Sequence, residues 1–218
     1  MTQDVKAPRR YQSAHRREQA ARTRRKIVRA AQRLFLRHGY AGATMAAVAA
    51  ESGVVVETVY RSFGSKGRLF GAVVESALAG GADRAEVPVE ERPAIAAVIA
   101  ETDPERQVAL YAATQPGIHR RAGPLLRAVR DAAVLDTEID GVWRQIERGR
   151  YEGQGRFADL LGSRGSLRDG LRAEEATDIL WTLTSLAVYD LLVRERRWSP
   201  ERYQRWLTEA LRRELLGR

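Results

Sequence analysis

Residues 39–66 read GYAGATMAAVAAESGVVVETVYRSFGSK, and this stretch decides the fold of the N-terminal part of the chain. Thr44 is placed to cap a short helix over residues 45–52, because a threonine hydroxyl accepts a backbone N–H that a helix start leaves open. Gly53 then turns the chain, and a second short helix follows over about residues 55–63. The pattern predicts two short helices joined by a tight turn.

The spacing inside this stretch is that of a helix-turn-helix. Such a motif needs a small residue where the helices cross, a glycine in the turn, and an apolar residue that locks the second helix onto the first. Ala49, Gly53 and Val59 meet these needs at offsets of four and six residues. The inner side of the second helix is expected to carry Val56, Val59, Tyr60 and Phe63. Thr58, Arg61 and Ser62 then face outward, toward a DNA major groove.

A helix precedes this motif and another follows it. Apolar side chains recur at helical spacing from about Thr23, and Gly39 is placed to end that first helix, with Tyr40 as the apolar contact beyond it. Ser65 is placed to cap a helix that runs to about residue 79. Residues 1–22 are polar, basic and almost free of large apolar residues, so we expect a disordered arm there.

These residues resemble the TetR family of bacterial transcriptional regulators. The resemblance covers residues 23–70 and is carried by GYAGATMAAVA at 39–49 and TVYRSFGSK at 58–66. It implies that the side chains of Thr58, Tyr60 and Lys66 bind DNA phosphates, and that Thr44 also contacts the DNA backbone. Physical chemistry agrees for Lys66, because an ammonium in the first turn of a helix adds to the attraction of free N–H groups for an anion.

The chain departs from the family pattern at the start of the second motif helix, where Val55-Val56-Glu57 replaces the usual Ser-x-Gly. Val55 can meet a thymine methyl group, and Glu57 can accept a hydrogen bond from a cytosine amino group. The alternative is that these residues only change helix propensity and solvation. With base reading included, the expected DNA-contacting residues are Thr44, Val55, Glu57, Thr58, Tyr60, Arg61 and Lys66.

Positive charge is concentrated at the N-terminus. The net charge is +9 at pH 7, but residues 1–70 hold 15 basic and 4 acidic side chains, whereas the remainder holds 22 basic and 24 acidic ones. Such asymmetry is typical of a protein in which one domain binds a polyanion such as DNA and the rest of the chain has another role. The basic residues of the arm, from Arg9 to Lys26, are expected to attract phosphates or enter the minor groove, unless they form only a solvated tail.

Beyond the motif the sequence predicts only helices. The fold class is therefore all-α, with a DNA-binding domain over residues 23–70 and a helical effector-binding and dimerisation domain over 71–218. A polar linker is expected at 80–93, and an irregular, glycine-rich connection at 151–170. Three prolines are expected to open helices: Pro104, Pro124 and Pro200.

A long apolar helix over 173–196 and an amphipathic helix over 200–216 close the chain. The first is apolar around most of its circumference, which is more than one face against its own core requires. A two-fold interface would bury the excess, and the resemblance implies such a homodimer; the alternative is a central core helix in a monomer. The expected interface residues are Leu183, Leu186, Tyr189, Trp206, Leu207 and Leu211.

The resemblance also implies that the C-terminal body binds a small effector. The candidate effector contacts are aromatic side chains that carry a polar group: Tyr111, His119, Trp143, Tyr151 and Trp181. Each is either a ligand contact or an ordinary core residue. The predicted protein is a bacterial cytoplasmic repressor that binds a pseudo-palindromic double-stranded DNA operator and is released by a small, largely apolar molecule.

Other classes of protein fit poorly. The chain has no cysteine, which excludes disulfides, zinc fingers and thiol nucleophiles. It carries no HExxH, GxSxG or Walker motif, so no enzymatic activity, metal or cofactor is expected. No stretch of 18 apolar residues is present, so no membrane span is expected. The alternative to a ligand-released repressor is an architectural or activating DNA-binding protein without an effector.

Overall fold

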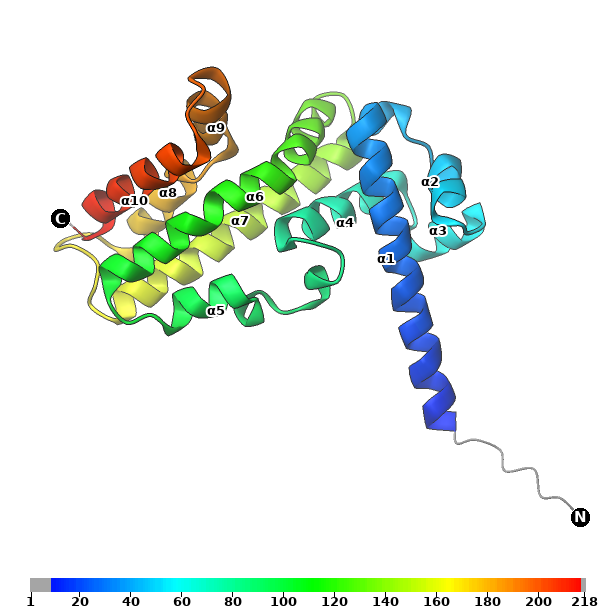
Figure 1. Cartoon of the computed structure of the whole chain (residues 1–218), viewed down its shortest axis with the longest axis horizontal. Helices are drawn as coiled ribbons and strands as arrows, with labels where there is room; N and C mark the ends of the chain where they lie inside the picture. The colour runs from blue at the N-terminus through cyan, green and yellow to red at the C-terminus, as the bar shows by residue number, and fades with distance from the viewer. Residues whose placement is uncertain (1–8, 217–218) are drawn as a thin grey trace, which may run out of the picture. The chain divides into compact units, whose positions relative to one another are not determined.

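The computed structural model describes residues 9–216, with side chains from residue 15 onward, and every regular element in this range is a helix (Figure 1). The all-α prediction is confirmed. The chain divides into two compact units, Met1–Val73 and Val74–Arg218, and the boundary falls inside helix α4.

The first unit consists of one long helix and the predicted pair of short ones. Its elements are α1 (Arg9–Gly42), α2 (Met45–Ser52), α3 (Val56–Phe63) and the first half of α4 (Lys66–Ala79). Thr44 caps α2 through its hydroxyl, which accepts a backbone N–H at 3.1 Å, and Gly53 ends α2 in the left-handed conformation at φ 67°. Gly39 interrupts α1 at φ 68°, and the Tyr40 ring beyond it stacks on Phe35. The Thr44 cap and the Gly53 turn are therefore confirmed, whereas Gly39 produces a kink in α1, which ends at Gly42.

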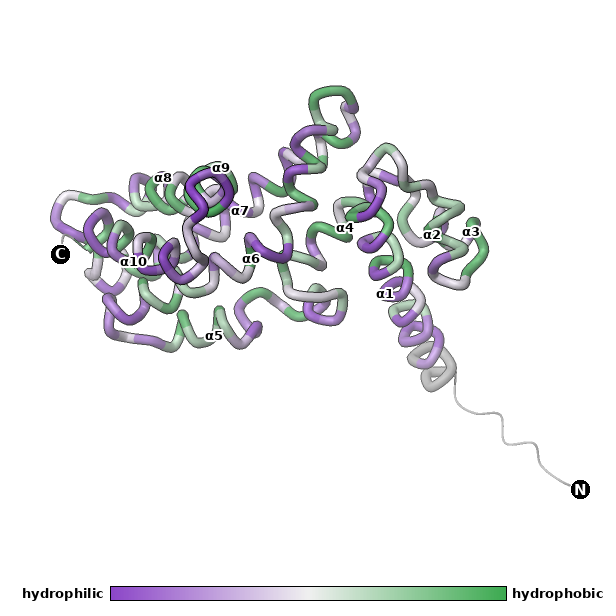
Figure 2. The backbone as a smooth tube through the Cα atoms, turned by 45° about the horizontal axis from the view of Figure 1, so that its top comes forward, coloured by the Kyte–Doolittle hydropathy of each residue, from purple (hydrophilic) through white to green (hydrophobic). Residues whose placement is uncertain are grey.

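Helix α1 corrects the prediction of a disordered arm. It begins at Arg9 rather than near Thr23, and residues 1–8 lie outside the described part of the chain. Residues 9–22 contain no glycine or proline and consist mostly of arginine, alanine, glutamine and glutamate, which favour helices. The described turns of this extension are mostly hydrophilic (Figure 2). A charged segment can therefore continue a helix whose later turns are anchored by the buried residues Ile27 and Ala31.

The second unit is built on two long helices that pack together, α6 (Pro104–Ala133) and α7 (Thr137–Ser163). The other elements are 3-10 turns at Arg84–Glu86 and Val89–Glu91, α5 (Pro93–Ala100), α8 (Ala173–Leu183), α9 (Leu186–Tyr189), a π-helix over Asp190–Glu195 and α10 (Pro200–Leu216). Helix α10 packs on α6 and α8, α8 on α7, and α5 on α6. Leu180, Tyr203 and Leu207 lie fully buried in the shared core.

Two predicted interruptions of these long helices are wrong. Helix α6 continues through Pro124, and α7 continues through its glycines to Ser163, which leaves only residues 164–172 irregular. A glycine costs about 1 kcal/mol relative to alanine inside a helix, but α7 buries Phe157 and neighbouring apolar residues along its length. A Cβ atom on Gly155 would lie 3.8 Å from the Thr177 side chain, which is an ordinary van der Waals contact, so the packing of α7 on α8 does not require this glycine.

The predicted polar linker and the predicted helix over 173–196 are also corrected. Residues 80–93 lie inside the second unit and contain the two 3-10 turns. The apolar run is broken after α8, where the Thr184 hydroxyl donates to the Leu180 carbonyl and Ser185 caps α9. By length and composition residues 173–195 suffice to cross a membrane. A third of its apolar window is buried, and the buried residues include Ala176 and Leu180 in the core of the second unit.

Candidate nucleic-acid interface

Helix α3 is fixed against α2 by the residues of the predicted helix-turn-helix spacing. Ala49 is 4% exposed and Val59 is fully buried, as the motif requires. At the turn, the Gly53 N–H bonds to the Ala50 carbonyl at 3.2 Å, and the Val54 N–H bonds to the Ala49 carbonyl at 3.0 Å. These bonds satisfy carbonyl groups that the end of α2 leaves open, and they determine where α3 begins.

The outer side of α3 presents a row of side chains to solvent. Val55 is 65% exposed, Glu57 and Arg61 are exposed, and Thr58 is half-buried. Tyr60 corrects the prediction of an inward-facing ring, because half of its surface is exposed. One residue along a helix rotates by about 100°, so a side chain next to the buried Val59 falls at the edge of the inner face. The Tyr60 hydroxyl is therefore accessible from outside the unit.

Lys66 is the first residue of α4 and lies beside the kink in α1. Its Nζ atom is 3.3 Å from the Ala41 carbonyl oxygen and 4.4 Å from the centroid of the Tyr40 ring. The neighbouring Ser65 hydroxyl accepts the Arg68 N–H at 3.2 Å and so caps α4. The ammonium is held next to a helix N-terminus, where an anion is favoured.

Arg24 has a structural role that the sequence reasoning missed. Its Nη1 atom donates to the Ser62 carbonyl at 2.8 Å, and its guanidinium lies 4.2 Å from the centroid of the Phe63 ring. A cation that binds a carbonyl in the last turn of a helix satisfies a group that the helix leaves open. Arg24 therefore links α1 to α3, the second helix of the helix-turn-helix, which is called the recognition helix below. The available signal was its position one turn before the buried residue Ile27.

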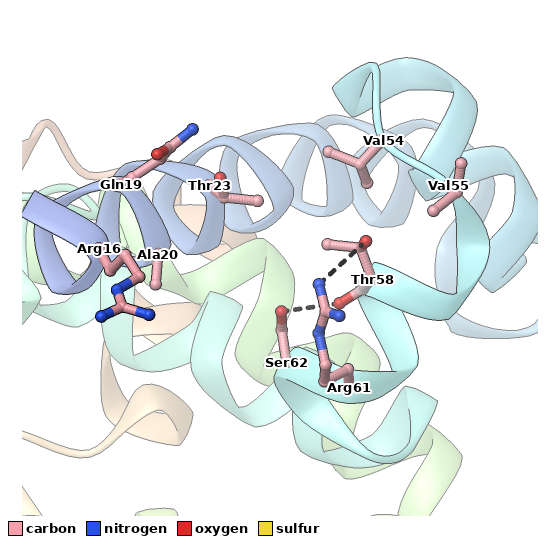
Figure 3. Close-up of a pocket in the computed structure, with 9 residues that line it drawn as sticks. All are labelled: Arg16, Gln19, Ala20, Thr23, Val54, Val55, Thr58, Arg61 and Ser62. Atoms are coloured by element: carbon pink, nitrogen blue, oxygen red, sulfur yellow. Dashed lines mark hydrogen bonds between the residues drawn. The ribbon is translucent and has the colours of Figure 1, made fainter. Parts of the chain in front are cut away.

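A groove of about 450 Å³ lies between the extension of α1 and α3 (Figure 3). It is lined from α1 by Arg16, Gln19, Ala20 and Thr23, and from the opposite side by Val54, Val55, Thr58, Arg61 and Ser62. One wall thus carries the Arg16 guanidinium and the other carries that of Arg61, whose Nη2 atom is 3.5 Å from the Thr58 hydroxyl. A groove with arginine on both walls beside a recognition helix suits a phosphate backbone.

In the second unit, two of the predicted effector contacts lie at the core. His119 is 5% exposed, and its ring stacks on Tyr189 with centroids 4.5 Å apart. Tyr111 stacks on Phe157 with centroids 4.3 Å apart. Burial lowers the pKa of His119 to about 4 and raises the pKa of Tyr111 to about 12, because the interior disfavours the charged form of each group.

The other predicted effector contacts lie elsewhere in this unit. Tyr151 and Trp181 are 39% and 38% exposed. The Tyr151 hydroxyl donates to Asp178 at 3.1 Å, and the Arg150 guanidinium lies 4.8 Å from the centroid of the Trp181 ring. Trp143 is half-buried on α7. The five residues differ in burial, and their role as effector contacts stays a prediction.

Most of the predicted dimer contacts belong to the core of their own unit. Four of the six are buried, namely Leu186, Tyr189, Leu207 and Leu211. A side chain enclosed by its own chain is not available to a partner, so these four correct the predicted interface. Leu183 and Trp206 are half-buried, and Leu191, which was not predicted, is 52% exposed.

A capped helix-turn-helix with an exposed recognition helix, on a basic unit joined to a second helical unit, defines a helix-turn-helix DNA-binding transcriptional regulator. Residues 27–73 match the family model described as bacterial regulatory proteins, tetR family. The resemblance to the TetR family is thereby confirmed, and the chain carries that family's DNA-binding domain.

Solved structures share the fold over most of the chain. A protein assigned as a TetR-family transcriptional regulator from Mesorhizobium loti is 21% identical, with a TM-score of 0.67 over 88% of this chain and 94% of that one. The regulator FadR from Bacillus subtilis, in complex with stearoyl-CoA, is 15% identical, with a TM-score of 0.64 over 85% and 96%. A protein assigned as a transcriptional regulator from Saccharomonospora viridis, in complex with choline, is 21% identical, with a TM-score of 0.65 over 89% and 98%. No curated protein matches the chain.

Proposed function

We propose that this protein is a bacterial cytoplasmic repressor that binds a pseudo-palindromic DNA operator as a homodimer and leaves it when a small, largely apolar molecule binds the second unit. The observation that carries the proposal is the exposed row on α3, which is flanked by the positioned Lys66 ammonium. Thr58, Tyr60 and Lys66 hold phosphates, with Thr44 at the start of α2. Val55, Glu57 and Arg61 face the base edges.

Two single substitutions test this division between phosphate and base contacts. Lys66→Ala is expected to weaken operator and random DNA alike by about 1 kcal/mol, because a phosphate looks the same under every base. Glu57→Ala is expected to relax preference at one symmetric pair of operator positions while leaving random DNA nearly unchanged. Affinities for operator and scrambled DNA at several salt concentrations measure both effects.

The salt series provides the control for this assignment. The slope of log K against log salt is expected to be about −5 or steeper for the unmodified dimer, and flatter by about one unit per subunit in Lys66→Ala. A Lys66→Ala variant that loses operator affinity but keeps its affinity for scrambled DNA would show that Lys66 reads sequence. A flat salt response would exclude the phosphate contacts altogether.

The homodimer is proposed to form through apolar side chains that remain partly or mostly exposed near the end of the chain: Leu183, Leu191 and Trp206. Leu191→Arg is expected to convert the dimer into a monomer in sedimentation experiments at micromolar concentration. Leu135→Arg is the matched control, because Leu135 is 92% exposed in the turn after α6 and lies outside the proposed interface. An unmodified protein that sediments as a monomer would contradict the dimer.

Release by an effector is supported by the fold and by one contact of α6. Two proteins that share this fold were solved in complex with small molecules, one with stearoyl-CoA and the other with choline. Here α6 carries the buried His119, and two residues further Arg121 lies with its Nε atom 3.4 Å from the Ala77 carbonyl oxygen in the last turn of α4. Helix α4 begins at Lys66, so a ligand that shifts α6 acts on the helix that carries a proposed phosphate contact.

A thermal-shift screen followed by a DNA-release assay tests the effector proposal. A ligand can shift DNA binding only by its differential affinity for the two states, with a coupling of typically about 1–3 kcal/mol. Compounds that stabilise the protein but leave operator affinity unchanged would contradict effector release. They would favour the alternative of an architectural or activating DNA-binding protein.

A further inference from the structure

The break between α8 and α9 is surrounded by a polar cluster buried inside the second unit. Thr184 at the break is 2% exposed, and His119 on α6 and Gln154 on α7 are each 5% exposed. The His119 Nε2 atom lies 3.1 Å from the Thr184 carbonyl oxygen, and the Gln154 Nε2 atom lies 2.7 Å from the Thr184 hydroxyl. Side chains from two helices therefore converge on one residue of the break.

The hydrogen bonds of Thr184 determine which atoms of the cluster can donate. The Thr184 hydroxyl gives its only proton to the Leu180 carbonyl at 2.7 Å, so it must accept from Gln154, and the Gln154 amide presents its NH₂ group there. A carbonyl only accepts, so His119 Nε2 must carry a proton. The Gln154 Oε1 and His119 Nδ1 atoms are left as acceptors, provided that the imidazole is neutral.

The neutral imidazole is favoured by its surroundings. Burial lowers the pKa of His119 to about 4, and the positive charges of Arg150 and Arg127 act in the same direction. His119 therefore carries one proton at pH 7, on Nε2, and its Nδ1 lone pair is available as an acceptor.

Three buried polar atoms of this cluster lack a hydrogen-bond partner among the residues that the structure describes: His119 Nδ1, Gln154 Oε1 and the Tyr203 hydroxyl. Aromatic rings accompany them, since the Tyr189 ring stacks on His119 and meets the Tyr203 ring edge-on at 5.0 Å between centroids. Burying unpaired polar atoms costs free energy, and several such atoms in one place are typical of a binding site that a ligand completes.

The chemistry of these atoms restricts the ligand. An anion can only accept hydrogen bonds, so it would leave both acceptors unpaired, and the donors near it would be the hydroxyls of Tyr203 and of Tyr111, which already hydrogen-bonds to Gln154 and Thr184. A cation would be repelled by Arg127 and Arg150, which already disfavour positive charge on His119. We infer that the second unit binds a neutral, flat apolar molecule that carries an N–H or O–H donor, directed at His119 Nδ1 and Gln154 Oε1. The inference rests on the proposed effector function and names the chemical class of the effector.

Indole and benzofuran test this inference, because they are nearly equal in shape and differ by an N–H donor against a ring oxygen. Titration calorimetry on the full chain is expected to show indole binding about tenfold or more tightly than benzofuran, since a site built to accept a hydrogen bond rejects an analogue that lacks the donor. In protein labelled with ¹⁵N-histidine, the Nδ1 resonance of His119 is expected to shift with indole and not with benzofuran.

Two variants test whether Gln154 and His119 cause the preference for indole over benzofuran. Gln154→Met is expected to abolish most of the discrimination, as is His119→Phe. Gln107→Met is the control, because Gln107 is also fully buried with an unpartnered Oε1 atom but lies twelve residues before His119 on α6, about 18 Å along the helix. If a variant fails to fold, the ¹⁵N measurement on the unmodified protein still tests whether the N–H group of indole reaches His119 Nδ1.

Equal affinity for the two probes, binding of neither probe, or discrimination that survives both cluster variants would each overturn the inference. Binding of neither probe would assign the unpaired atoms to water alone. The effector proposal is tested separately by operator affinity: indole that binds the cluster but leaves DNA binding unchanged contradicts effector release and leaves the ligand class intact.

Discussion

The two units place their polar groups in opposite ways. In the first unit they lie at the surface and are held by helix ends: Thr44 caps α2, and Lys66 opens α4 beside the Ser65 cap. In the second unit the polar side chains of His119 and Gln154 lie inside the core. A surface fixed by backbone geometry is ready for DNA at any time, whereas a buried cluster must open to receive a ligand. Substitutions should therefore act through different physics in the two units.

The largest expected effect comes from placing a charge under the recognition helix. Val59→Asp buries a carboxylate at a position without exposed surface, which should destabilise the first unit by about 4 kcal/mol or more and abolish DNA binding. Val55→Asp is the control, because Val55 is 65% exposed and the fold should persist. Circular dichroism with urea denaturation measures both. Equal tolerance of the two substitutions would contradict the placement of α3.

The buried cluster should make the second unit sensitive to acid. The pKa of His119 is about 4 in the folded chain against an ordinary value of 6.5, so below pH 6.5 the unfolded chain binds the proton first. Stability present above pH 6.5 should therefore fall by about 3 kcal/mol as the pH drops to 4. Comparing the unfolding free energy at several pH values with that of His119→Phe isolates this loss. An unchanged pH dependence in the variant would contradict it.

Ion pairs offer a comparison within the second unit. Arg127 and Asp190 meet at 2.8 Å with side chains 21% and 14% exposed, so Arg127→Met should cost about 2 kcal/mol by leaving a partly buried carboxylate poorly paired. The Arg130–Asp131 pair is 46% and 70% exposed, and Arg130→Met should cost about 0.5 kcal/mol or less. Denaturant titration of both variants measures the difference, and equal costs would show that burial does not set the strength of the pair.

The smallest expected effects separate two glycines. Gly53→Ala should destabilise the first unit by about 1 kcal/mol, because Gly53 has φ 67° at the turn and an L-residue is strained there even though its Cβ meets nothing within 4 Å. Gly149→Ala, also without a contact to its Cβ, lies inside α7 and should stabilise the second unit by about 0.5–1 kcal/mol. Melting curves of the two variants should move in opposite directions, and a shift in the same direction would contradict this account.

The same contrast explains what the sequence could predict. Local chemistry determines the helix-turn-helix, so the Thr44 cap, the Gly53 turn and the burial of Ala49 and Val59 were all predictable from spacing. Arg24 was missed because its partner, the Ser62 carbonyl, lies 38 residues further along the chain.

The second unit was less predictable because packing overrides local signals there. Pro124 and the glycines of α7 suggested breaks, yet both helices continue, since their faces are buried by helices distant in sequence. The opposite error occurred at Thr184, where an apolar pattern suggested one helix and hydroxyl groups instead interrupt it. Leu207 and Leu211 have the pattern of an interface or a core, and only the three-dimensional packing assigned them to the core.

Selection of bound DNA from a random pool tests the central claim most directly. Two copies of the recognition helix related by a two-fold axis predict an inverted repeat, with half-sites separated by about one helical turn of DNA or a multiple of it. With Glu57→Ala, the enriched sequences should lose their base preference at one symmetric pair of positions. With Lys66→Ala, they should keep their base preference at every position. Enrichment of a single asymmetric site, or no enrichment, would contradict the proposal that this protein binds DNA as a two-fold dimer through α3.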